Sequence, residues 1–186
     1  MRILGIDPGT LRLGYGVIDQ IGPGRSAYVD CGVITATARA AREARLLTIG
    51  RDLRDLLGEL RPDVVAMEQA FFGKNVQATL ALGEARGMAL FVAQDWGQTH
   101  GLALAGYPPA LIKQTITGRG AASKDQVGFF VCALLKLKRP PAADAADALA
   151  IALTHARLAG ARRRVDHARD RELDRHPQQK SMRGAK

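Results

Sequence analysis

The chain opens with the stretch Arg2-Ile3-Leu4-Gly5-Ile6-Asp7-Pro8-Gly9-Thr10. Its apolar run over residues 2–7 is typical of a buried strand, and Pro8-Gly9 predicts a turn directly after it. The segments 13–19 and 26–34 predict two further strands, with the turn residues Gly22-Pro23-Gly24 between them. Three consecutive strands at the start of the chain favour an antiparallel meander.

The rest of the chain alternates between helical and strand patterns. Leucine and isoleucine recur every three or four residues over 42–60, which predicts an amphipathic helix that ends before Pro62. The apolar runs 63–68 and 102–106 predict two more strands, and further helices are expected at 75–94, 108–117, 123–137 and 144–158. The sequence therefore predicts an α/β fold: a mixed five-stranded sheet, formed by the antiparallel meander plus two further strands, flanked by helices.

Length and composition predict one domain and a tail. The chain has 186 residues, of which 47% are hydrophobic, and we expect a folded domain over 1–160 followed by a basic, disordered tail over 161–186. The formal net charge of +9 indicates a polyanionic partner. No apolar run is long enough to span a membrane, and the sequence shows neither a signal peptide nor cysteines at metal-ligand spacing. We therefore expect a cytoplasmic protein without a membrane partner.

Four acids stand out because of their surroundings. Asp7 and Glu68 each end an apolar strand, where an unpaired buried charge is costly. Asp144 and Asp147 lie three residues apart among alanines, which places both on one helix face near its N-terminus. Each has an ordinary alternative: a turn for Asp7, a salt bridge for Glu68, and acids favoured by the helix dipole for the pair. That all four are ordinary is the weaker interpretation.

A cluster of carboxylates would raise the pKa of its members by mutual repulsion, and a divalent cation removes that conflict. Oxygen ligands without histidine or cysteine suit Mg²⁺ or Mn²⁺ rather than Zn²⁺. Two such ions can carry out phosphodiester hydrolysis, one by activating water and the other by stabilising the leaving oxygen. The four acids therefore predict a metal-dependent phosphodiesterase with two ions in each active site.

Several stretches follow one another in a specific order. They are Gly5-Ile6-Asp7-Pro8-Gly9-Thr10, Gly14-Tyr15-Gly16-Val17-Ile18, Met67-Glu68-Gln69-Ala70-Phe71-Phe72-Gly73-Lys74-Asn75, Leu82-Gly83-Glu84-Ala85-Arg86-Gly87, Ile112-Lys113-Gln114 and Asp144-Ala145-Ala146-Asp147-Ala148-Leu149-Ala150-Ile151-Ala152-Leu153-Thr154-His155. Together they resemble the RuvC family of crossover junction endodeoxyribonucleases, from residue 1 to about 158. A single piece is a weak signal, whereas the ordered set is highly specific.

The resemblance implies a fold, an activity and partners. The fold is RNase H-like, and the metal-binding catalytic quartet is Asp7, Glu68, Asp144 and Asp147. Some family members carry a histidine at the first acid of the last motif, whereas this chain has Asp144, so an all-carboxylate site is expected. The implied enzyme is a homodimer that resolves four-way (Holliday) DNA junctions by paired symmetric nicks in recombination and repair, beside a RuvA–RuvB branch-migration complex.

The loops after these acids supply candidate DNA-binding residues. Phe71 and Phe72 follow Glu68, and we expect one ring to stack on an unpaired base at the branch point, a role that the resemblance gives to Phe71. The alternative for the pair is a buried hydrophobic plug. Residues expected to contact the DNA backbone, each also explained as an ordinary surface or capping residue, are Lys74, Asn75, Lys113, Arg119 and Lys124.

Gly83 and Gly87 lie four residues apart on one face of the helix expected at 75–94. Small residues at this spacing favour a close helix contact. That contact is either with the sheet of the same subunit or, as the resemblance implies, with a second copy across a two-fold axis.

Three other functions stay open at this point. A sugar kinase or actin-like ATPase shares the RNase H-like core and a similar Asp-Pro-Gly-Thr loop, but it needs two such domains and the chain has room for one. An RNase H-like nuclease acting on RNA would use the same chemistry on a different substrate. A non-enzymatic basic DNA-binding protein would explain the charge but not the four acids.

Overall fold

The computed structural model describes residues 1–69 and 75–175, with side chains placed up to residue 160. Five strands form one mixed sheet in the order β3-β2-β1-β4-β5. The strands are β1 (Arg2–Asp7), β2 (Arg12–Gly22), β3 (Arg25–Thr35), β4 (Val64–Glu68) and β5 (Ala103–Tyr107). The first three pair antiparallel, and β4 and β5 continue the sheet parallel to β1. The predicted α/β sheet is thereby confirmed.

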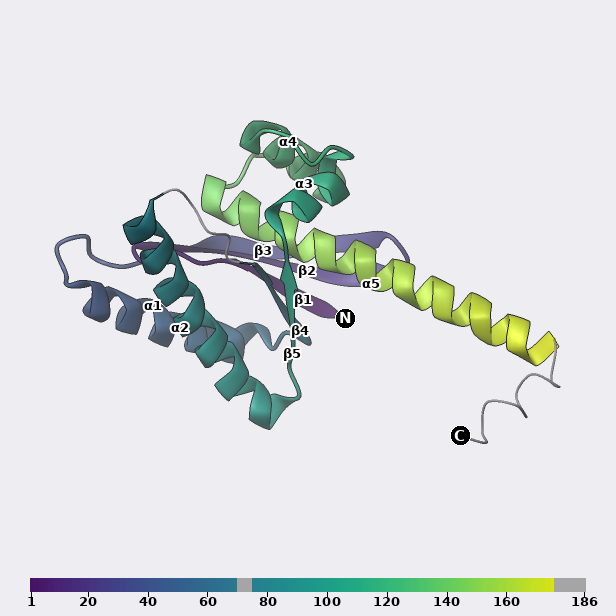
Figure 1. Ribbon diagram of the computed structural model, residues 1–186, viewed down its shortest axis with the longest axis horizontal. Helices are drawn as coiled ribbons and strands as arrows, with labels where there is room; N and C mark the ends of the chain where they lie inside the picture. The colour runs from purple at the N-terminus through teal and green to yellow at the C-terminus, as the bar shows by residue number, and fades with distance from the viewer. Residues whose placement is uncertain (70–74, 176–186) are drawn as a thin grey trace.

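Helices cover both faces of this sheet (Figure 1). They are α1 (Arg42–Leu60), α2 (Val76–His100), α3 (Pro109–Thr117), α4 (Lys124–Leu135) and α5 (Ala143–Arg175). Neighbouring residues of a strand point to opposite faces. Ile3 therefore belongs to the core shared with α3, α4 and α5, whereas Leu4 belongs to the core shared with α1 and α2. Each face of the sheet thus has its own hydrophobic core.

Glycines in β1 and β2 let α5 lie directly on the sheet. A Cβ at Gly5 would overlap the carbonyl oxygen of Ala148, and a Cβ at Gly14 would overlap that of Asp144. The same backbone approach continues at Gly16, where a Cβ would overlap Leu149. The first turns of α5 are therefore held against the strands by backbone contact.

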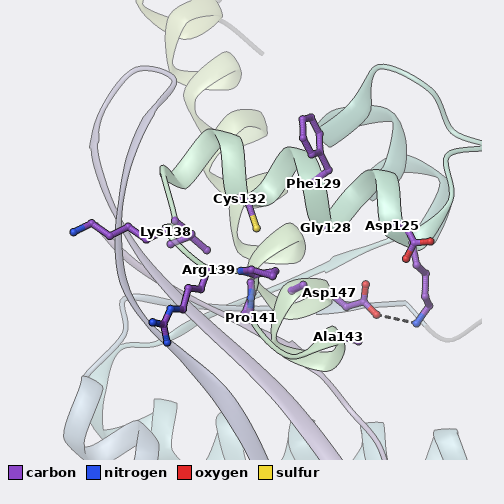
Figure 2. A pocket seen from close by; sticks show the side chains of 13 residues that line it. Asp125, Gly128, Phe129, Cys132, Lys138, Arg139, Pro141, Ala143 and Asp147 are labelled. Carbon is purple, nitrogen blue, oxygen red and sulfur yellow. Dashed lines mark hydrogen bonds and ion pairs between the residues drawn. The ribbon is translucent and has the colours of Figure 1, made fainter.

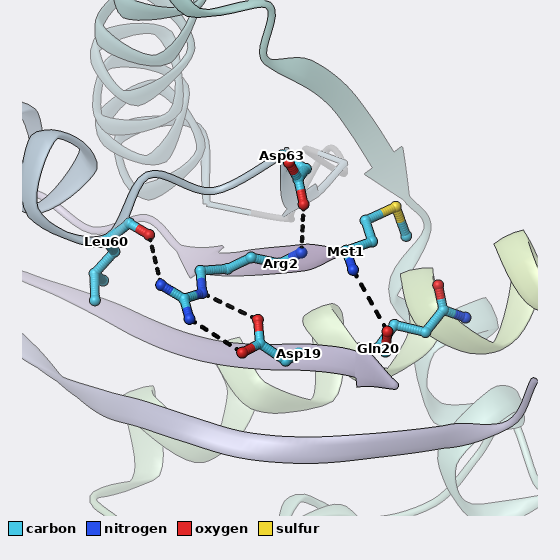
Figure 3. A network of polar contacts seen from close by, with 6 residues as sticks. All are labelled: Met1, Arg2, Asp19, Gln20, Leu60 and Asp63. Carbon is cyan, nitrogen blue, oxygen red and sulfur yellow. Dashed lines mark hydrogen bonds and ion pairs between the residues drawn. The ribbon is translucent and has the colours of Figure 1, made fainter. Parts of the chain in front are cut away.

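A polar network fixes the N-terminal end of β1, at Arg2 (Figure 3). The Arg2 guanidinium donates to both carboxylate oxygens of Asp19 at 3.0 Å and to the carbonyl oxygen of Leu60 at 3.0 Å. The main-chain amide of Arg2 donates to the Asp63 carboxylate at 2.6 Å. This network ties β1 to β2 and to the loop between α1 and β4, and it lowers the pKa of Asp19 through the hydrogen bond from Arg2.

Two helices are longer than the sequence predicted. α2 continues past residue 94 to His100, where Gly101 ends it in the left-handed conformation with φ 71°. α5 continues past residue 158 to Arg175, so the expected boundary at residue 160 between domain and tail falls inside a helix. Residues 176–186 lie outside the described part of the chain. Among the described helices, none combines the length and apolar character needed to cross a membrane.

Candidate active site

Asp7 and Glu68 end neighbouring strands at one edge of the sheet. Ile6 of β1 pairs with Met67 of the parallel strand β4, so the acid that follows each of them emerges at the same level. The first turns of α5 lie at this edge, because the backbone of Asp144 rests on Gly14, which is itself paired with Asp7. The topology therefore brings together acids that are up to 140 residues apart in sequence.

A pocket of about 260 Å³ opens at this edge. Asp7, Glu68 and Asp147 line it together with Lys113 and Lys124. Its remaining lining is mainly apolar, from α3, α4 and α5. Three of the four predicted acids thus share one pocket with two of the predicted DNA-binding lysines.

The carboxylates of the site perturb one another. Burial raises the pKa of Asp7 to about 7, and the negative charges of Asp147, Glu68 and Asp144 add to this effect. Burial also raises the pKa of Glu68, with a further contribution from Asp147. Such mutual shifts require the groups to lie close together in a partly desolvated place. The fourth acid, Asp144, therefore belongs to the same electrostatic cluster although it lies outside the pocket lining.

Two cations from distant parts of the chain pair with the acids of α5. Lys124 Nζ lies 2.8 Å from Asp147 Oδ2, and Arg12 Nε lies 2.7 Å from Asp144 Oδ2. The hydrogen bond with Asp147 raises the pKa of Lys124. Sequence reasoning found no basic residue near this pair of acids and missed Arg12, because the contact forms only when β2 meets the start of α5.

The donor set suits a hard divalent cation, but the acids are not drawn tightly together. Among the side chains that the structure places, no three aspartate, glutamate, histidine or cysteine groups are arranged to hold one ion. Asp144 and Asp147 are each engaged by a cation instead. Arg12 and Lys124 supply positive charge at the acids that a metal ion would otherwise neutralise. The raised pKa values of Asp7 and Glu68 are expected where carboxylates lie together without the divalent cation that would neutralise them.

The structure locates four of the seven predicted DNA-binding residues. Lys113 on α3 lines the pocket, and its charge opposes the rise in the pKa of Glu68. Lys124 starts α4, where Ser123 caps the helix. Arg119 is exposed in the loop between α3 and α4 and does not line the pocket. Asn75 caps α2 by accepting a hydrogen bond from the Ala78 amide at 3.1 Å. Phe71, Phe72 and Lys74 lie outside the described residues.

Arg86 of α2 contacts the backbone of the site at Glu68. Its Nε donates a hydrogen bond to the main-chain carbonyl oxygen of Glu68 at 3.0 Å. The next residue is held as well, because the main-chain amide of Gln69 donates a hydrogen bond to the Tyr107 carbonyl oxygen at 2.8 Å. Sequence reasoning recorded Arg86 only as part of a motif and gave it no role, since its partner is a backbone atom that no side-chain pattern marks.

Comparisons with known proteins agree with this geometry. The family described as crossover junction endodeoxyribonuclease RuvC matches residues 3–155. A protein of that name from Halorhodospira halophila (strain DSM 244 / SL1) is 48% identical over 155 residues, covering 83% of this chain and 89% of the relative. One from Rhodopseudomonas palustris (strain BisA53) is 44% identical over 164 residues, covering 87% and 91%.

Solved structures give the same relationship. The structure described as T. thermophilus RuvC in complex with Holliday junction substrate matches with a TM-score of 0.78 and 34% identity, covering 86% of this chain and 95% of that one. The yeast mitochondrial Holliday junction resolvase Ydc2 matches at 16% identity with a TM-score of 0.61, covering 83% and 77%, and so shares the fold. The predicted RNase H-like fold is confirmed. With a family match over most of its length and relatives of this similarity, the chain belongs to the RuvC family of crossover junction endodeoxyribonucleases.

Proposed function

We propose that this chain is a structure-selective endonuclease that resolves four-way (Holliday) DNA junctions by paired symmetric nicks. The observation that carries the proposal is the pocket in which Asp7, Glu68 and Asp147 meet Lys113 and Lys124. Acids able to bind a divalent ion then lie beside cations able to bind phosphate. Family membership supplies the substrate class, and a relative is described in complex with a Holliday junction substrate.

RuvC-family nucleases in general depend on divalent metal ions. In this chain Asp7, Glu68, Asp144 and Asp147 would hold Mg²⁺ or Mn²⁺, with two ions per site. Ions held there would supply activation of the attacking water and charge stabilisation for the leaving oxygen. Two lysines of the chain would bind the substrate. Lys113, beside Glu68, holds the phosphodiester against the acids. Lys124 releases Asp147 and binds a phosphate oxygen in its place. The apolar wall of the pocket limits water and strengthens these charge interactions.

A homodimer is the second part of the proposal, and the surface of α2 supports it. A Cβ at Gly83 or Gly87 would meet no atom within 4 Å, so neither glycine packs on the sheet of its own subunit. Val76, Leu80 and Phe91 are exposed by 70%, 61% and 67% and follow the same helical spacing as the two glycines. This exposed apolar stripe fits a second copy of α2 across a two-fold axis. Two identical sites then match a junction with two-fold symmetry. A RuvA–RuvB complex as a further partner rests on the family resemblance alone.

Synthetic DNA substrates test the nuclease. We expect cutting of a four-way junction in Mg²⁺ or Mn²⁺, no cutting in EDTA, and poor cutting of duplex DNA and RNA–DNA hybrids. Asp7→Asn should bind the junction and fail to cut it. Asp52→Asn on the exposed side of α1 is the matched control and should cut at the wild-type rate. Preferential cutting of the hybrid would reassign the substrate.

Oligomeric state tests the dimer. Leu80→Arg places a charge in the exposed stripe of α2 and should convert the protein to a monomer in sedimentation equilibrium. Ile21→Arg is the control, because Ile21 is similarly exposed at 58% but lies in β2, away from α2. A wild-type protein that sediments as a monomer at micromolar concentration would contradict the dimer.

A further inference from the structure

A second, larger pocket lies next to the candidate active site. It has a volume of about 480 Å³ and is formed by α4, the start of α5 and the loop that joins them (Figure 2). Lys124 and Asp147 line both this pocket and the active-site pocket, so the two pockets adjoin at that ion pair. We call this second pocket the α4–α5 groove. A strand held at the acids would have a direct path into it.

The groove carries a separate basic side. Lys138 and Arg139 line it from the connecting loop, and both are exposed. Figure 2 shows them on the side opposite Asp125, the carboxylate at the other end of the groove. The second acid of the lining, Asp147, is already neutralised by Lys124 at 2.8 Å. The side of the groove farther from Asp125 is therefore positively charged. This charge attracts the phosphates of a nucleic acid.

The groove also has an aromatic rim and an open floor. Phe129 lines the groove and is 71% exposed, and Figure 2 shows its ring projecting outward from α4. Gly128 lies in the lining, and a Cβ there would meet no atom within 4 Å, so the groove is open at this point. An exposed ring beside a cationic wall is the combination that binds unpaired nucleotides, because every base has a face that can stack and every linkage carries a charge.

We infer that the α4–α5 groove binds the DNA strand that continues from the cut site, with Lys138 and Arg139 on its phosphates and an unpaired base stacked on Phe129. The inference rests on the proposed function and adds to it a place for the nucleotides that flank the cut. A protein segment is the competing occupant. The position of the groove beside the active-site pocket and its two neighbouring cations, Lys138 and Arg139, favour the nucleic acid.

Charge removal gives the first test. Binding of a synthetic four-way junction in EDTA is measured over a range of salt concentrations for wild type and Lys138→Ala/Arg139→Ala. Loss of two phosphate contacts should reduce the slope of log affinity against log salt by about 1.4 to 1.8. Arg25→Ala/Arg61→Ala removes the same charge at the far end of the sheet and should leave the slope unchanged. An unchanged slope in the groove variant would overturn the inference.

Filling the groove gives the second test. Gly128→Leu projects a side chain into open space and should weaken junction binding about tenfold without lowering Tm. Gly58→Leu on α1, where a Cβ also meets nothing within 4 Å, is the matched control and should bind like wild type. Wild-type affinity of Gly128→Leu, with its fold intact by circular dichroism, contradicts a strand in the groove and points to a protein segment instead.

Stacking gives the third test. Phe129→Ala should weaken binding while keeping the wild-type salt slope, because a stacked base releases no counterion.

Failure of the inference and failure of the proposed function give different results. If wild type neither binds nor cuts the junction, the nuclease assignment fails and the groove assignment falls with it. If wild type cuts the junction and all three groove variants match it, only the groove assignment fails.

Discussion

Arg86 Nε lies 3.0 Å from the main-chain carbonyl oxygen of Glu68, so the helix proposed to form the dimer is bonded to the strand end that carries one of the proposed catalytic acids. The bond restrains the end of β4 at the point where the chain leaves the sheet. Arg86 is half-buried, which strengthens a charged donor to a carbonyl relative to an exposed one. We therefore assign Arg86 a positioning role for Glu68.

Arg86→Ala should lower the turnover of junction cleavage by about tenfold and leave the affinity for the junction unchanged, because Glu68 loses its restraint while the DNA contacts remain. Arg86→Lys should recover part of the rate. Arg157→Ala removes a similar arginine-to-carbonyl bond, from α5 to Thr115, and is the control for a purely structural effect. Both alanine variants should lose about 1.5 kcal/mol of stability in urea unfolding. Equal turnover of the two would refute the role of Arg86.

The raised pKa of Asp7 predicts how the metal-free protein responds to pH. An acid whose folded-state pKa is about 7, against 3.8 in the unfolded chain, holds its proton more tightly when folded. Its contribution to stability is then complete below about pH 4 and is lost as the pH rises to 7. In EDTA, the Tm of wild type should fall between pH 5 and pH 8 relative to that of Asp7→Asn. Asp52→Asn, on the exposed side of α1, should retain the wild-type pH dependence, and a Tm difference that is constant with pH would contradict the assignment.

The Lys124–Asp147 ion pair predicts opposite effects on metal binding and on cleavage. Lys124→Gln frees Asp147 and removes a positive charge from the pocket, so Mn²⁺ binding in calorimetry should strengthen by about two- to fivefold, the scale of a partly exposed ion pair. Junction cleavage should weaken in the same variant, because a phosphate contact is lost. Weaker Mn²⁺ binding by Lys124→Gln would show that the pair does not compete with the metal.

The cap of α4 sets the position of Lys124. Ser123 accepts from the Gln126 amide at 3.2 Å, while the Gln126 side chain accepts from the Ser123 amide at 3.0 Å. Ser123→Ala should cost about 1 kcal/mol in urea unfolding and reduce cleavage, because Lys124 is the first residue of the helix. Ser123→Thr keeps the capping oxygen and should restore both. A cleavage defect that survives in the threonine variant would separate the cap from the position of Lys124.

The sequence predicted the elements well where the local pattern was strong. The strand over 2–7 and the helix over 42–60 match the structure residue for residue, since each has a clear apolar period and a breaker at its end. The sequence predicts that α2 ends at residue 94, whereas the helix runs to His100 and is terminated by Gly101, whose φ of 71° other residues adopt only with strain. The segment 161–186 has little apolar content, which predicts a disordered tail, whereas α5 runs through its first part to Arg175.

The residues of the candidate site also fall into two groups: those that a local sequence pattern marks and those that only the folded chain brings together. Asp7 and Glu68 were visible because charged strand ends are costly unless they have a function. Asp7 and Glu68 meet through the parallel pairing of β1 and β4, and Asp147 joins them in one pocket because α5 packs on the glycines of β1 and β2. The sequence shows no sign of Arg12 and Arg86 as partners of the site, since Arg12 reaches the Asp144 carboxylate and Arg86 the main-chain carbonyl of Glu68 only through tertiary contacts. The α4–α5 groove likewise exists only once α4 and α5 are packed together.

The glycine contacts between the sheet and α5 couple two of the proposed catalytic acids to the hydrophobic core. Asp144 and Asp147 stand on the same helix whose next turns, from Ala148 to Ala152, fill the core against β1 and β2. Loosening of the acids therefore requires disruption of the main core, and heat should abolish cleavage and secondary structure in a single step. Any residue larger than glycine at position 5 or 14 would meet the backbone of α5 and would therefore displace the two acids together with their helix.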